Sequence, residues 1–75
     1  MHELLERALS IIDAAVFVQE MQIRQIDEDL KFWQKQKPSE VRRTALEKWQ
    51  RKKEISVAKR DQCLKLVRMI NDICA

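Results

Sequence analysis

Apolar residues recur along the first half of the chain at alternating intervals of four and three residues. This series, the first stripe, comprises Leu5, Leu9, Ile12, Val16, Gln19, Ile23, Ile26, Leu30 and Trp33. Only Gln19 among them is polar. Such spacing places every member on one side of an α-helix and is typical of a helix that packs lengthwise on a partner helix. The pattern predicts a long helix from about residue 3 to about residue 36.

A second helix is predicted from about residue 39 to about residue 73, beyond Pro38, the only proline of the chain. Because proline disfavours the helical conformation of the residue before it, the first helix should end by Lys37. Ser39 is a suitable N-cap for the second helix, and the alternative is that Pro38 is its first residue. Since so short a link makes neighbouring helices antiparallel, we expect residues 1–75 to form one all-α, coiled-coil-like hairpin.

Pairing the two helices so that facing residue numbers add to 75 tests the hairpin on the sequence itself. In this register Ile26 faces Trp49. Gln19, the polar member of the first stripe, faces Ser56. A polar layer matched across two helices is typical of a device that fixes their register. Further facing pairs are Leu5–Ile70, Leu9–Leu66, Ile12–Cys63 and Leu30–Ala45.

The same register makes predictions about charged residues. The predicted cross-helix ion pairs are Asp27–Lys53, Glu20–Arg60 and Asp29–Lys48. Exposed pairs of this kind contribute about 0–1 kcal/mol each, so they specify alignment more than they stabilise. The register also places Lys52 and Lys59 on the seam between the helices. Either their stems lie along the seam with the amines at the surface, or the helix rotates so that Ile55 and Ala58 replace them.

The first half of the first helix has more apolar residues than one partner helix can cover. A second stripe beside the first comprises Leu4, Ala8, Ile11, Ala15 and Val18, and Ala14, Phe17 and Met21 widen it. On the second helix, Met69 is apolar and lies outside the seam. A helix that is apolar nearly all the way round is buried on several sides. We therefore expect the second stripe and Met69 to contact a second copy, in a homodimeric four-helix bundle, or another helical protein.

Composition fits a protein of long helices inside the cell. Charged residues make up 36% of the chain and glycine is absent, which leaves few positions for turns. No apolar run approaches the ~18 residues of a membrane span, and the first residues lack the basic region of a signal peptide. Cys63 and Cys74 would lie ~16 Å apart on one helix, too far for an intrachain disulfide. We expect reduced cysteines in the cytoplasm or nucleus, with an intermolecular disulfide as the alternative.

No catalytic, cofactor or metal site is expected. His2 is the only histidine, and no pair of His or Cys has metal-ligand spacing. Without glycine there is no glycine loop to bind phosphate, and Cys63 lacks a histidine base that would make it a nucleophile. The acidic residues that flank the second stripe do not favour anionic lipid. We predict a non-enzymatic scaffold that binds neither small molecules nor membranes.

Positive charge is concentrated in the second helix. Residues 1–36 carry seven acidic and four basic residues, a net charge of −3, whereas residues 37–75 carry eleven basic and five acidic residues, a net charge of +6. A basic helix that also carries an aromatic residue can contact phosphates and stack a base. The candidate nucleic-acid contacts are Arg42, Arg43, Arg51, Lys52 and Lys53. Because several basic residues have acidic partners and Trp49 faces the seam, RNA or DNA binding is the alternative to the scaffold function.

Overall fold

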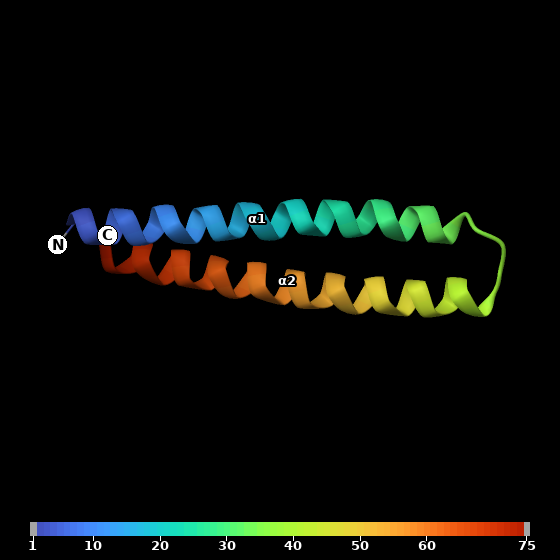
Figure 1. Cartoon of the computed structure of the whole chain (residues 1–75). Coiled ribbons are helices and arrows are strands. Elements are labelled where there is room, and N and C mark those ends of the chain that lie inside the picture. The colour runs from blue at the N-terminus through green and yellow to red at the C-terminus, as the bar shows by residue number, and fades with distance from the viewer. Residues whose placement is uncertain (1, 75) are drawn as a thin grey trace.

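The computed structural model describes residues 2–74, with side chains from Glu3 to Ile73. Within these residues it consists of two α-helices, α1 (His2–Gln34) and α2 (Glu40–Cys74), and no strand. The helices run antiparallel over their whole length, so the start of α1 and the end of α2 lie together, opposite the connecting turn (Figure 1). The hairpin measures 56 × 14 × 13 Å. The predicted all-α helical hairpin is confirmed.

Ser39 and Arg42 shape the turn between the helices. Ser39 is the N-cap of α2: its Oγ accepts a hydrogen bond from the backbone N–H of Arg42 at 3.1 Å, and its carbonyl oxygen accepts one from Arg43 at 3.1 Å. The Arg42 guanidinium reaches back to the end of α1 and donates to the carbonyl oxygens of Trp33 at 3.1 Å and Gln34 at 3.3 Å. These carbonyls have no partner within α1, and the positive charge suits the negative end of its dipole. α1 ends at Gln34, two residues before the predicted end.

The core of the hairpin is thin. Among the described residues only Ile26, Leu30 and Ser56 are buried, and the other seam residues are half-buried. Two helices side by side cover one stripe of each other and leave the remaining surface to solvent. A half-buried apolar side chain realises only part of the about 1.5–3 kcal/mol that full burial contributes.

The predicted register holds in the middle of the hairpin. Ile26, Trp49 and Ser56 line one groove between the helices. Asp27 Oδ1 lies 2.7 Å from Lys53 Nζ, as predicted. The other two predicted ion pairs are not formed among the described residues. Arg60 instead places its Nη2 3.3 Å from the carboxylate of its neighbour, Asp61.

The seam of α2 departs from the predicted line. Ile55 and Ala58 do not replace the lysines, and Lys52 lies beside the seam with its amine over the Trp49 ring. Lys52, Lys59 and Leu66, all placed on the seam by the register, are exposed, and so are Ile55 and Ala58. The half-buried residues are instead Lys53, Arg60 and Val67, each one position after Lys52, Lys59 and Leu66 respectively. The change is the same one position in each heptad, because Ser56, Cys63 and Ile70 stay in the seam and only the residues between them are exchanged. Leu66 therefore leaves the core.

Candidate interaction face

A groove in the middle of the hairpin shows which positions of the two helices share one side. Gln25 of α1 lines this groove together with Lys52 and Ile55 of α2. Residues seven apart in an α-helix lie on nearly the same side, because seven residues make almost two full turns. Seven-residue steps continue this side toward the open end of the hairpin, where the two chain termini lie. From Gln25 the steps reach Val18, Ile11 and Leu4 of α1. On α2 they reach Lys59, Leu66 and Ile73 from Lys52, and Gln62 and Met69 from Ile55.

Six apolar members of these series form what we call the apolar face: Leu4, Ile11 and Val18 of α1 with Leu66, Met69 and Ile73 of α2. All six are exposed, and Leu4, Ile11 and Ile73 keep 68%, 71% and 72% of their surface. Because the helices are antiparallel, moving seven residues toward the start of α1 covers the same distance along the hairpin as moving seven residues toward the end of α2. Leu4 therefore lies level with Ile73, and Ile11 with Leu66. Exposed apolar residues gathered on one side of a protein are candidates for an interaction surface.

The sequence predicts most of this face. Four members of the predicted interface are exposed members of the apolar face: Leu4, Ile11, Val18 and Met69. Ala8 and Ala15 are half-buried beside the seam. Leu66 and Ile73 are not among the predicted interface residues. The predicted register places Leu66 on the seam. The heptad spacing of Leu66 and Ile73 from Lys52, an exposed residue, is the signal that identifies both.

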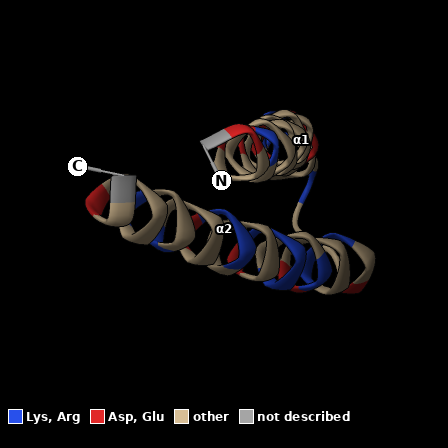
Figure 2. Cartoon of the chain, turned by 90° about the vertical axis from the view of Figure 1, so that its left-hand side faces the viewer, with Lys and Arg blue, Asp and Glu red and all other residues tan. Residues whose placement is uncertain are grey.

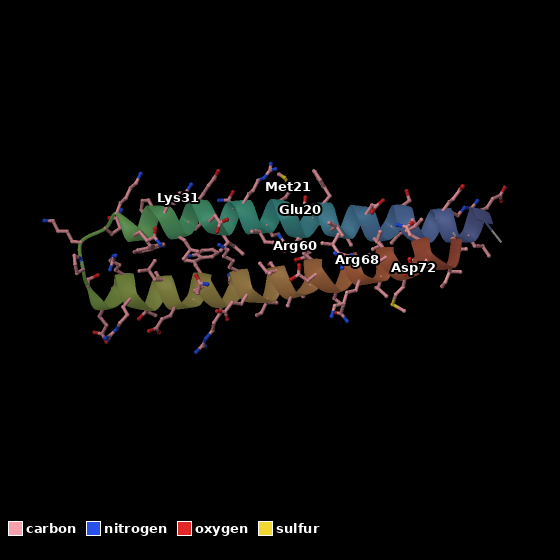
Figure 3. The ribbon with its side chains drawn as sticks, turned by 180° about the vertical axis from the view of Figure 1, so that it is seen from behind. Glu20, Met21, Lys31, Arg60, Arg68 and Asp72 are labelled. Atoms are coloured by element: carbon pink, nitrogen blue, oxygen red, sulfur yellow. The ribbon has the colours of Figure 1, made fainter. Side chains whose placement is uncertain are left out.

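Phe17 and Met21 of α1 are exposed apolar residues that lie outside the apolar face. Phe17 keeps 62% of its surface and Met21 keeps 48%. Figure 3 shows the Met21 side chain pointing away from α2, and Phe17 lies about one turn before it on the same helix. They therefore widen the apolar surface of α1 toward its back and do not extend the surface shared with α2.

The middle of the side that carries the apolar face is mixed in character. Its groove has a volume of roughly 380 Å³ and is lined by both polar and apolar residues: Gln22, Gln25, Ile26 and Asp29 of α1, and Trp49, Lys52, Ile55 and Ser56 of α2. On α2 the Nζ of Lys52 lies 4.6 Å from the centre of the Trp49 ring, within the range of a cation–π contact. This part of the surface thus presents an acidic group from α1 and a basic group from α2.

Gln19 and Ser56 both lie in the seam beside this groove. Ser56 keeps 7% of its surface, and Gln19 is half-buried. The Oε1 of Gln19 is buried and accepts no hydrogen bond from the described residues. Leaving a buried acceptor without a partner costs about 1–3 kcal/mol. The predicted polar layer therefore sits in the core as a weak point of the hairpin.

A smaller apolar cluster lies at the tip of the hairpin, near the turn. The rings of Phe32 and Trp33 meet edge to face, with centroids 5.5 Å apart and planes at 83°. Val41 is exposed and lines a groove with Trp33 and Lys48. Val41 and Lys48 belong to the heptad series of Ile55, so this tip groove lies on the same side as the apolar face.

The five candidate nucleic-acid contacts do not form one surface. Arg42 binds the end of α1, and Lys53 is paired with an aspartate. Arg43, Arg51 and Lys52 are exposed. Consecutive helical residues point about 100° apart, so the adjacent basic residues diverge. Lys and Arg recur along α2 together with Asp and Glu and do not form an uninterrupted basic stripe (Figure 2).

Neither helix, over residues 2–74, has a stretch long and apolar enough to cross a membrane. The described side chains contain no group of three or more His, Cys, Asp or Glu arranged to hold a metal ion. Cys63 is a half-buried free thiol, and the side chain of Cys74 lies outside the described residues.

Comparison of the chain with protein-family models, curated proteins and solved structures finds no match. Function is therefore inferred from the surfaces of the hairpin.

Proposed function

We propose that this chain is a non-enzymatic self-association module, in which the apolar face packs on the same face of a second copy to form a four-helix bundle. One observation carries the proposal: Leu4 and Ile11 of α1 and Leu66 and Ile73 of α2 are all exposed. Their heptad spacing from Gln25 and Lys52, which line the same groove, places the four residues on one side of the hairpin. An apolar surface built jointly by two helices fits a second pair of helices better than it fits a single strand or loop.

The thin core supports the same proposal. Small domains bury too little surface to be stable unless another element adds to the core. Fully burying one Leu, Ile or Met side chain contributes about 1.5–3 kcal/mol, and the apolar face offers six side chains per copy. A second copy would cover the exposed side of the seam, so that the seam residues would lie nearer the centre of a four-helix bundle.

Sedimentation velocity across a concentration series tests the proposal. We expect the wild-type chain to be dimeric between about 5 and about 500 µM, since dimer formation depends on protomer concentration. Ile11→Glu places a charge at the centre of the apolar face and should shift the chain to monomer. Leu64→Glu is the matched control, because Leu64 is exposed on a different side of α2, and it should leave the dimer intact.

A well-folded wild-type monomer at the highest concentration would overturn the proposal, as would equal weakening by the two substitutions. Circular dichroism of each sample separates dissociation from unfolding. A partly folded monomer that gains helix only with a different protein would transfer the apolar face to that partner and also overturn self-association.

A further inference from the structure

We infer that the two copies associate in parallel, with both hairpin tips at the same end of a bundle whose two-fold axis runs along its length. This inference rests on the proposed self-association and specifies how the partner copy is oriented. If two such faces meet, the two-fold axis lies either along the hairpin or across it. The first choice stacks α1 of each copy on α2 of the other. The second choice stacks α1 on α1 and α2 on α2.

The charges of the helices favour the parallel arrangement. α1 carries seven acidic and three basic residues, whereas α2 carries five acidic and ten basic residues. Parallel copies therefore place an acidic helix on a basic one, and antiparallel copies place like charges together. Complementary potentials across an interface select the correct partner orientation, because like-charge contacts are costly.

The charged residues beside the interface give the same answer. Gln25 lies level with Lys52 in the central groove, so Asp29, one turn further along α1, lies level with Lys48. In the parallel bundle Asp29 of one copy approaches Lys48 and Lys52 of the other. In a full-length antiparallel bundle the two-fold axis passes near Lys59, and the Lys59 side chains of the two copies meet.

The apolar residues also match better in parallel. With the tips together, every level of one hairpin meets the same level of the other, so Ile11 packs on Leu66 of the second copy. In the full-length antiparallel bundle Ile11 would instead meet Gln25, and Leu66 would meet Lys52. Such contacts bury polar groups without partners, which costs free energy.

A third arrangement, in which antiparallel copies overlap only at their open ends, matches apolar residues but covers less of the hairpin. Such an overlap covers only part of the 56 Å length and leaves the tip cluster at Trp33 and Val41 uncovered. Because a stable interface needs about 800 Å² per partner, the arrangement that covers the full length is favoured.

Pulsed dipolar EPR between nitroxides at the tips tests the orientation. The label is attached through Lys37→Cys, at an exposed position in the turn, in a chain carrying Cys63→Ala and Cys74→Ala. Sedimentation first checks that this background still forms the wild-type dimer. The parallel bundle predicts a short label separation, since packed helix axes lie about 8–10 Å apart. A separation near the 56 Å length of the hairpin, or beyond it, would overturn the parallel orientation.

A second measurement uses the native chain and remains informative if the cysteine-free background does not fold. Isotope-filtered NOEs in a dimer of labelled and unlabelled copies report contacts between copies only. We expect cross-peaks from Ile11 to Leu66. Cross-peaks from Ile11 to Gln25, or from Ile11 to its own counterpart, would overturn the inference while leaving self-association standing. A folded monomer would overturn the proposed function itself, so the two failures are distinct.

Discussion

The guanidinium of Arg42 donates a hydrogen bond from Nε to the backbone carbonyl of Trp33 at 3.1 Å, and so ties the first turn of α2 to the last turn of α1. The same group also reaches the carbonyl of Gln34. One side chain thereby contacts two carbonyl oxygens at the end of α1, of which that of Trp33 also accepts a hydrogen bond from the backbone N–H of Gln36 at 3.1 Å. The sequence marks Arg42 as one basic residue among many, whereas the structure gives it a specific role in closing the hairpin.

We predict that Arg42→Ala destabilises the hairpin by about 1–2 kcal/mol, because hydrogen bonds from a charged donor contribute about 1.5–3 kcal/mol and this one is partly exposed. Urea unfolding followed by circular dichroism measures the change. Arg43→Ala is the matched control, since Arg43 is an exposed neighbour, and it should change the stability by less than about 0.5 kcal/mol. Equal effects of the two substitutions would show that Arg42 does not clamp the turn.

The fold was predictable because its signals are local and repeated. Nine positions at four-three spacing define α1, and the Pro38–Ser39 link specifies the turn. The line of contact on α2 was not predictable in the same way. A one-residue shift separates Leu66 from Val67, and the sequence offers a reasonable apolar residue at both. Only the packing of α2 on α1 shows that Val67 is half-buried and Leu66 exposed.

The candidate face could be predicted in part because α1 has more apolar residues than one partner helix covers, and not because the chain carries a recognisable motif. Leu4, Ile11 and Val18 exceed what one partner helix covers, so the sequence identifies them as a contact surface. Leu66 and Ile73 join that surface only when the side of α2 is known, which requires the packed hairpin.

Substitution of Gln19 should stabilise the hairpin, whereas substitution of Arg42 should destabilise it. The Oε1 of Gln19 is buried without a hydrogen-bond partner, so Gln19→Leu should raise the free energy of unfolding by about 1–2 kcal/mol, the range of the removed desolvation cost. Chemical denaturation of the two proteins measures the gain. Gln25→Leu, at an exposed position, is the control and should give little change. Destabilisation by Gln19→Leu would mean that the amide contributes a compensating contact.

The ion pair between Asp27 and Lys53 should be weak and sensitive to salt. Both side chains keep more than a third of their surface exposed, at 41% and 34% respectively, and exposed pairs contribute about 0.2–1 kcal/mol. A double-mutant cycle with Asp27→Asn and Lys53→Gln should give a coupling energy in this range, which falls in about 1 M salt. The equivalent cycle for Glu20 and Arg60 should give no coupling. Comparable coupling in both cycles would show that Arg60 reaches Glu20 as well as its neighbour Asp61.

Nucleic-acid binding is the alternative function, and we predict that it is absent. Arg42 and Lys53 are engaged within the chain, and the exposed Arg43, Arg51 and Lys52 point in divergent directions, so they cannot follow one phosphate backbone together. Fluorescence anisotropy with labelled single-stranded RNA and duplex DNA measures binding, and it is done at ~50 mM salt because phosphate contacts are strongest at low salt. We expect no saturable binding under these conditions. Binding that weakens steeply with added salt and is lost in an Arg43→Ala, Arg51→Ala variant of unchanged helicity would establish the basic helix as a functional surface.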